Sequence, residues 1–317
     1  MKKLILLYIL IFPLITSAQK WKRQRREIIL GVGAANFLGD LGGADQIGTY
    51  YLKDLEFSQT RTNTCAAYRY RYSQNIYFKG NFNYGRIQGN DLLTKDPARN
   101  YRRLQFRSNI WEFSGTFEYA ITEERIKGRY IRGQSRFPVN IYTILGLGVT
   151  FFNPKGKYNG SNTAYQEKWF SLQPLHTEGQ GLEGGKKPYR LFTVVIPVGI
   201  GFKYPITNAW HIGLEYKLVK TFTDYMDDVG GNYYDNNTVI AANGDKGELA
   251  GYFADPSKEY DKNGGIPITY ADGSPLKNPT AAGQKRGNPS KLDSYMFGTL
   301  YVAYKLIKGQ NKSRVKF

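Results

Sequence analysis

The chain has 317 residues, of which 22% are charged and 15% are aromatic, and its formal net charge is +18. A single cysteine excludes an internal disulfide framework, and two histidines leave little material for histidine-based catalysis or a zinc site. The mean hydropathy of -0.49 suits a soluble protein, but it also suits a transmembrane barrel, whose strands alternate apolar and polar residues.

The N-terminus predicts export. Two lysines follow Met1, the stretch from Leu4 to Ile15 is almost wholly apolar, and small residues lead to Ala18. This is the pattern of a secretory signal, and the apolar run is too short to cross a membrane as a helix. We therefore expect residues 1–18 to be removed by cleavage after Ala18, and residues 19–26 to form a basic periplasmic lead-in.

Eight segments then alternate apolar and polar residues with the period of two that is typical of β-strands. In chain order they are Glu27–Asn36, Thr64–Tyr72, Ile76–Arg86, Leu104–Ala120, Val139–Phe151, Phe192–Tyr204, Trp210–Phe222 and Leu292–Leu306. The face assignment of the last segment is the least certain, because both of its faces carry aromatic residues.

The lengths of the connections alternate as well. Four are long, at residues 38–63, 88–103, 153–190 and 223–291, and those between them are mostly short. Long loops at one end and short turns at the other are typical of outer-membrane barrels. The sequence thus predicts an all-β fold, an antiparallel transmembrane β-barrel of about eight strands over residues 27–307, followed by a basic periplasmic tail at 308–317. An exported soluble β-sandwich is the alternative.

The polar face of the strands carries charges of both signs. A barrel of about eight strands is filled by its own side chains, and unpaired buried charges are unfavourable. We therefore expect a mutually paired lumen plug rather than a porin channel, built from Glu27, Arg69, Arg71, Lys79, Glu112, Glu118, Lys203, Glu215 and Lys217.

Candidate catalytic and metal sites are few. His176 lies in a long loop and His211 at a strand end, and an ordinary polar role suits both, so the sequence predicts no enzyme and no cofactor. Asp224, Asp227 and Asp228 could offer oxygen ligands to Ca²⁺. They lack the spacing of a known calcium loop, however, and aspartates commonly begin turns.

Basic residues concentrate in the segments assigned to the periplasmic side. The fullest group is Arg125, Lys127, Arg129, Arg132 and Arg136. It predicts an electrostatic docking face for an acidic periplasmic protein or for anionic lipid headgroups, with a merely solvated rim as the alternative. A net charge of +18 on an exported barrel favours partners in the cell envelope over nucleic acid.

Four short motifs resemble the PorG-like family of outer-membrane barrels associated with type IX secretion. They lie at Gly33–Leu41, Trp210–Glu215, Thr221–Val229 and, near the end, Arg286–Asn288 followed by Asp293–Phe297. The resemblance implies outer-membrane lipid around the barrel and attachment to periplasmic ring proteins resembling PorK and PorN. It therefore favours a non-enzymatic scaffold or anchor of a secretion machine. The alternative is a surface or transport-type barrel that binds an envelope polysaccharide or small ligand through its long loops.

Overall fold

The computed structural model describes residues 24–41, 57–94, 96–122, 139–262 and 278–306. The strands are β1 (Arg26–Leu38), β2 (Arg61–Arg71), β3 (Ile76–Asn90), β4 (Gln105–Ala120), β5 (Asn140–Lys157), β6 (Trp169–Ser171), β7 (Phe192–Pro205), β8 (Trp210–Thr221) and β9 (Ser294–Leu306). All eight strands expected from the sequence are present, and the short β6 is an addition.

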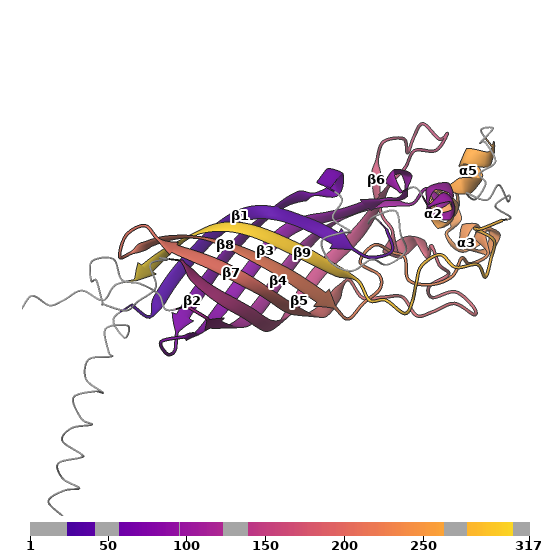
Figure 1. The fold of residues 1–317 in the computed structure, drawn as a ribbon. Coiled ribbons are helices and arrows are strands. Elements are labelled where there is room, and N and C mark those ends of the chain that lie inside the picture. Colours follow the sequence, from indigo (N-terminus) through magenta and orange to yellow (C-terminus); the bar gives the residue numbers. More distant parts are fainter. Residues whose placement is uncertain (1–23, 42–56, 95, 123–138, 263–277, 307–317) are drawn as a thin grey trace, which may run out of the picture.

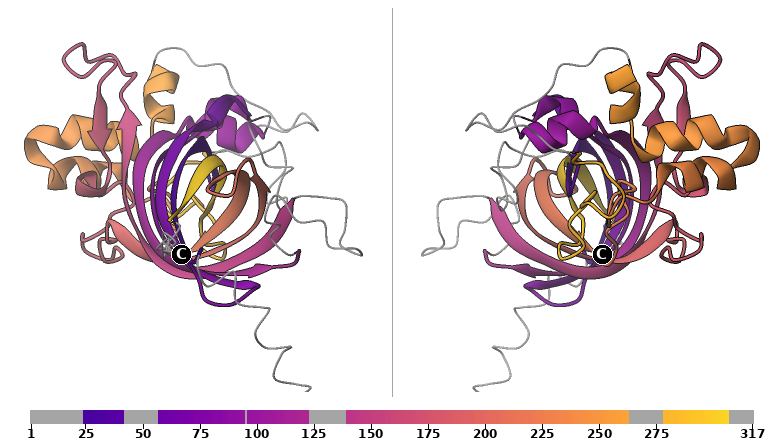
Figure 2. Two further views of the ribbon diagram at one scale, coloured as in Figure 1. Left: turned by 90° about the vertical axis from the view of Figure 1, so that its left-hand side faces the viewer. Right: turned by 90° about the vertical axis from the view of Figure 1, so that its right-hand side faces the viewer.

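The long strands form a closed barrel, as Figures 1 and 2 show. Each pairs antiparallel with its sequence neighbours, β5 pairs directly with β7, and β1 pairs with β9 from Arg26 opposite Leu306 to Leu38 opposite Ser294. The short β6 pairs only with the end of β5 that extends beyond the barrel. The fold is therefore a closed antiparallel barrel of eight strands, which confirms the predicted fold class.

Side chains alternate between the two faces of the wall, as the period of two requires. Leu30 and Leu147 point outward and are 63% and 65% exposed, whereas Glu112 and Lys217 point inward and are 0% and 1% exposed. In β9, Leu300 and Val302 lie outside, and Tyr295, Phe297 and Tyr301 lie inside. The uncertain face assignment of the last strand is thus resolved.

Aromatic rings gather on the outer face near both ends of the barrel. Tyr84 and Trp111 lie 4.4 Å apart by ring centroids near the helical end, and Trp210 and Tyr304 lie 4.8 Å apart near the opposite end. Such paired girdles around an apolar band are typical of barrels that cross a membrane.

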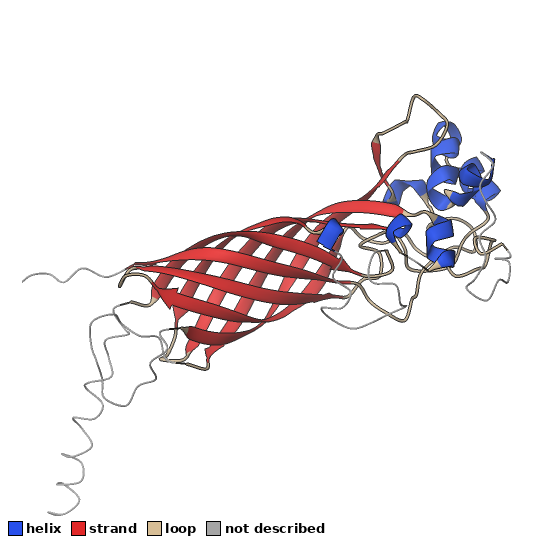
Figure 3. Cartoon of the chain, turned by 45° about the horizontal axis from the view of Figure 1, so that its top comes forward, coloured by secondary structure: helices blue, strands red, loops and turns tan. Residues whose placement is uncertain are grey.

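The long connections contain helices that the sequence analysis did not predict. They are η3 (Phe57–Gln59), η4 (Asp91–Leu93), α2 (Pro97–Arg102), η5 (Gln173–Leu175), α3 (Asn236–Ala242), η6 (Gly244–Lys246), α4 (Gly247–Ala254) and α5 (Ser257–Lys262). Figure 3 shows α2 to α5 gathered at one end of the barrel. None of the helices in the described part of the chain is long and apolar enough to span a membrane.

This helical cap has an apolar core of its own. Leu41, Met226, Val229, Leu249 and Phe253 are all buried, and they belong to the same cluster as residues inside the upper barrel. The described part of the last long loop is therefore packed on a core and not splayed into solvent.

Candidate functional site

The lower half of the lumen is organised around Arg69 on β2, which is 1% exposed. Its guanidinium reaches three carboxylates: Nε lies 2.7 Å from Glu118, Nη1 3.0 Å from Glu27 and Nη2 3.2 Å from Glu215. These carboxylates come from β4, β1 and β8, so one side chain ties together distant parts of the wall. Charge-assisted bonds of this kind are the strong ones in a water-poor interior.

Lysines surround the same carboxylates. Lys79 Nζ lies 2.6 Å from Glu118 and 2.5 Å from Glu215. Three further inward lysines complete the set: Lys203 is 3.2 Å and Lys305 is 4.0 Å from Glu27, and Lys217 is 3.9 Å from Glu215. Lys305 was not among the residues predicted for the plug. Its position alternates with outward Tyr304 and Leu306, so a firm face assignment for the last strand would have revealed it.

Arg71 occupies a different place from the other predicted plug residues. It donates to the backbone carbonyls of Ser73 and Gln74, at 3.2 and 2.7 Å, and so turns toward the short link between β2 and β3. It therefore lies at the mouth opposite the helical cap, away from the central network.

The upper half of the lumen is built around Glu112 and neutral donors. Tyr295 Oη donates to it at 2.7 Å, and Asn83 Nδ2 and Ser114 Oγ donate at 2.9 Å. Above this level the interior becomes apolar, with Ile87, Ile110, Val195, Val219 and Phe297 fully buried. The lumen thus changes from ion pairs to neutral hydrogen bonds and then to an apolar layer beneath the cap.

Inward glycines make room for the tyrosines of the lumen. Tyr142 and Tyr301 bond through their hydroxyls at 2.8 Å, and Tyr142 also donates to Glu215 at 2.8 Å. A Cβ at Gly201 would lie 2.2 Å from the Tyr142 ring, and one at Gly213 would lie 2.2 Å from the Tyr301 ring. Small residues on one strand and large rings on another therefore interlock across the barrel.

At the helical end, four segments far apart in the sequence meet in what we call the mouth knot: Gly39–Leu41, Thr223–Val229, Arg286–Asn288 and Asp293. Asp227 accepts the backbone N–H groups of Leu41 and Val229, each at 3.0 Å. Asp40 accepts the N–H of Asn288 at 2.6 Å, and Asp293 accepts the N–H of Met226 at 2.9 Å. Parts of three of the motifs quoted from the sequence thus converge on one structure.

Two buried arginines join the mouth knot to the cap. Arg286 lies 3.1 Å from Glu178, donates to the carbonyl of Asp228 at 2.6 Å, and reaches the carbonyl of Phe253 on α4 at 3.2 Å. Arg102 bonds the carbonyls of Asp40 and Arg286 and pairs with Asp91. Neither arginine was predicted to have such a role, although Arg286 lies within one of the motifs quoted from the sequence.

The carboxyl groups of the mouth knot are crowded together away from water. Burial raises the pKa of Asp224 to about 8, with a further contribution from the negative charges of Asp40 and Glu178. Burial also raises the pKa of Asp227 and of Asp293, and neighbouring aspartates raise both further. Asp224 is therefore disposed to keep its proton at neutral pH.

The three aspartates named as candidates for Ca²⁺ differ in their contacts. Asp227 is engaged by backbone N–H groups, whereas Asp228 accepts from Thr177 and Tyr189 at 2.5 and 2.6 Å. Both oxygens of Asp224 lack a hydrogen-bond partner among the described residues. Within the described ranges, no group of three or more His, Cys, Asp or Glu side chains is placed to hold a metal ion.

The two histidines lie at opposite ends of the molecule. His176 contacts the carbonyl of Gln180 in the cap, while His211 is buried at the start of β8, opposite Ala303 of β9. They therefore cannot share one site. The predicted docking residues Arg125, Lys127, Arg129, Arg132 and Arg136 lie outside the described residues.

Solved barrels give distant likenesses of fold. A crystal structure of Ail from Yersinia pestis, in complex with the heparin analogue sucrose octasulfate, has 10% identity and a TM-score of 0.35, over 89% of this chain and 99% of that one. Neisserial surface protein A has 10% identity and a TM-score of 0.36, over 88% and 96%. OprG from Pseudomonas aeruginosa, an outer membrane protein, has 10% identity and a TM-score of 0.34, over 90% and 98%.

No curated protein matches the chain. A family model described as a domain of unknown function, DUF6089, matches residues 3–166, which is just over half of the sequence. The chain therefore belongs to the DUF6089 family.

Proposed function

We propose that this chain is a non-enzymatic integral barrel of the outer membrane that works as a scaffold and not as a channel. One observation carries the proposal: the wall is apolar on the outside, while the lumen is filled by paired charges and closed by the cap. A wide pore needs a water-filled interior, and an eight-stranded barrel packed with side chains leaves none.

The outer face supports placement in a membrane. Large apolar side chains such as Leu30, Leu147, Phe113 and Leu214 are 63%, 65%, 53% and 49% exposed. Monomeric soluble proteins rarely expose a continuous apolar belt of this extent. A closed barrel leaves no unpaired strand edge, as crossing a lipid bilayer requires.

Cell fractionation tests the location. The chain, carrying an epitope tag, should remain in the outer-membrane fraction after extraction with alkaline carbonate and be released only by detergent. A matched form with residues 1–18 removed should stay in the cytoplasm. Recovery of the full chain as a soluble periplasmic protein would contradict membrane insertion.

Within this location, we propose a role as an anchor of a type IX-like secretion machine, with periplasmic ring proteins resembling PorK and PorN as partners. The PorG-like motifs support it, because three of the four motifs contribute the segments of the mouth knot. A sealed barrel also suits a protein whose task is to hold partners at the membrane.

Affinity purification from detergent-solubilised membranes tests this role. We expect ring proteins to co-purify, and a variant with Gln at Arg125, Lys127, Arg129 and Arg132 to assemble normally but to lose most of its partner. A matched variant with Gln at four cap residues, Lys187, Arg190, Lys246 and Lys258, should retain it. Equal retention by both variants at low and high salt would rule out the basic segment as the dock.

The ordered cap favours a second candidate function. Helices α3 and α4 pack on an apolar core above the lumen, so the long loops present a defined surface. Such a surface suits binding of an envelope polysaccharide or small ligand. Binding that is lost with the cap loops, in a protein that captures no periplasmic partner, would favour this role over the scaffold.

A further inference from the structure

Charges on the barrel strands are sorted by sign between the two faces of the wall. All four acidic residues of these strands, Glu27, Glu112, Glu118 and Glu215, are buried in the lumen. The charged residues that alternate outward are all basic: Arg26 near the periplasmic end, and Arg86, Arg107, Lys155, Lys157 and Lys220 toward the cap. Every charged residue on the outer face of these strands is therefore basic.

Three of these cations gather on neighbouring strands. Arg86 on β3 lies opposite Asn109 on β4, and its Nε donates to the Asn109 side chain at 2.9 Å. Two residues further along the same face, Arg107 on β4 lies opposite Lys155 on β5. We call Arg86, Arg107 and Lys155 the basic face.

No acid neutralises the basic face within the part of the chain that the structure describes. The Arg107 guanidinium stacks 3.9 Å above the Trp169 ring, and Arg86 donates to the neutral side-chain amide of Asn109. Lys155 forms no ion pair with a described carboxylate. By contrast, the neighbouring Lys157 pairs with Glu167.

The basic face lies just beyond the outer aromatic girdle. Arg86 follows Tyr84 by two residues on β3, and Arg107 and Lys155 lie four residues beyond Trp111 and Phe151 on their own strands. At about 3.3 Å per residue and a tilt of roughly 40°, these offsets correspond to roughly 5–10 Å above the rings. Girdle aromatics sit at the level of lipid headgroups, so the cations reach the headgroup phosphates and the sugars above them.

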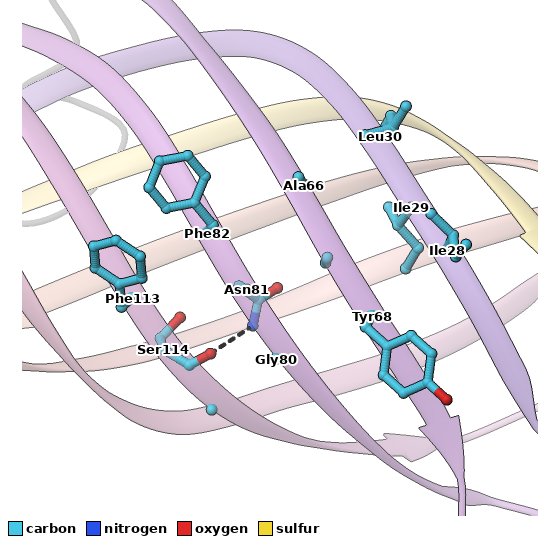
Figure 4. Close-up of a pocket in the computed structure, with 12 residues that line it drawn as sticks. Ile28, Ile29, Leu30, Ala66, Tyr68, Gly80, Asn81, Phe82, Phe113 and Ser114 are labelled. Atoms are coloured by element: carbon cyan, nitrogen blue, oxygen red, sulfur yellow. Dashed lines mark hydrogen bonds between the residues drawn. The ribbon is translucent and has the colours of Figure 1, made fainter.

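A hollow in the lipid-facing wall continues the same strands toward the membrane centre (Figure 4). Its floor includes Gly80 and Gly115, paired across β3 and β4, where an added Cβ would meet nothing within 4 Å. Phe82 and Phe113 stand beside it. Gly80 lies six residues below Arg86, or roughly 15 Å along the membrane normal, which is about half the hydrocarbon thickness.

We propose that this side of the barrel is a binding site for an anionic, phosphate-bearing lipid of the outer leaflet. The headgroup phosphates bind the basic face, and the acyl chains run over Phe82 and Phe113 into the hollow. The planar guanidinium of an arginine can donate to two phosphate oxygens at once, and the ammonium of Lys155 adds a further positive charge. The inference rests on the outer-membrane location proposed above.

Native mass spectrometry of the full-length protein in a zwitterionic detergent tests the site. The probes are lipid A carrying two phosphates and the same lipid A with both phosphates removed. We expect the phosphorylated form to bind at least about tenfold more tightly, since each of the three basic side chains attracts the phosphates.

Two triple variants complete the experiment. The variant R86Q/R107Q/K155Q should lose this preference for phosphate. The matched variant K187Q/K246Q/K258Q removes the same charge from exposed cap lysines and should bind within about twofold of the parent. A fourth variant, G80L/G115L, fills the hollow with two leucine side chains. It should weaken the binding of both lipids to the same extent, because the three cations remain in place.

Three outcomes would overturn the inference: equal binding of the two lipids by the parent protein, an unchanged preference in R86Q/R107Q/K155Q, or competition by a soluble sulfated glycan stronger than binding of the lipid. Because the protein is purified from fractionated membranes, a failure of the lipid site leaves it in the outer membrane. A failure of the proposed location instead shows as its absence from that fraction.

Discussion

Replacing Arg69 with Met tests whether the ion pairs of the lumen hold the barrel together. The substitution preserves much of the side-chain volume but removes the cation shared by Glu27, Glu118 and Glu215. Removing one partner of a buried ion pair typically destabilises a protein by about 3–5 kcal/mol. Here each carboxylate keeps a lysine within 2.5 to 3.2 Å, so we expect a loss of about 3 kcal/mol, the lower end of that range.

Equilibrium unfolding in detergent micelles, followed by tryptophan fluorescence in guanidinium chloride, measures this loss. The double variant R69M/E118Q should recover about 1 kcal/mol, because it neutralises one carboxylate left with too little positive charge. The matched variant R190M, which removes an exposed arginine, should stay within about 0.5 kcal/mol of the parent. If R69M unfolds at the midpoint of the parent, the central network does not stabilise the barrel.

Three further predictions concern the wall, the lumen and the cap. Leu214→Arg should impair assembly in heat-modifiability gels, since a cation on the lipid face costs about 2–4 kcal/mol near the midplane; normal assembly would mean that the outward assignment of β8 is wrong. In planar bilayers the purified protein should show no steady conductance of porin size, and a reproducible one would refute the filled lumen. Arg286→Met should speed proteolysis of the cap while leaving the barrel intact, because it frees Glu178 and Asp228; unchanged cleavage would mean that the mouth knot does not depend on this arginine.

The cap should also respond to pH. Asp224 has a pKa of about 8 against an ordinary value of 3.8, so its protonated form is favoured by folding. Its contribution to stability is fully present below pH ~4 and declines by up to about 1.4 kcal/mol per pH unit until pH ~8. Hydrogen exchange of residues 224–230 should therefore speed up as pH rises, beyond the intrinsic pH effect. Asp224→Asn should flatten this dependence, and an unchanged slope would refute the assignment to Asp224.

Much of the barrel could be predicted from the sequence, because alternation along a strand fixes which side chains share a face. Leu214 and Glu215 are neighbours in the chain, yet they end on opposite sides of the wall. The same rule failed to place Lys305, since Tyr295, Phe297 and Tyr301 made the inward face of the last strand look as apolar as the outward face. The lumen accommodates these rings because facing positions such as Gly213 carry no side chain.

The cap could not be predicted in the same way. Helices of six to eight residues such as α2, α3 and α4 give too short a pattern to distinguish from a loop. The mouth knot also depends on contacts between residues separated by up to 248 positions, such as Asp40 with Asn288. The motifs contain these residues, but only the closed barrel shows that they contact one another in the mouth knot.

The pairing of β1 with β9 has a consequence for the order in which the barrel can assemble. The first strand of the barrel finds one of its two neighbours only when the last strand of the chain is available. Until then the chain carries two open edges, each a template for pairing with other chains. The incomplete barrel must therefore be protected from such pairing until its last strand is in place, and loss of that strand should yield aggregates and proteolytic fragments in place of a smaller barrel.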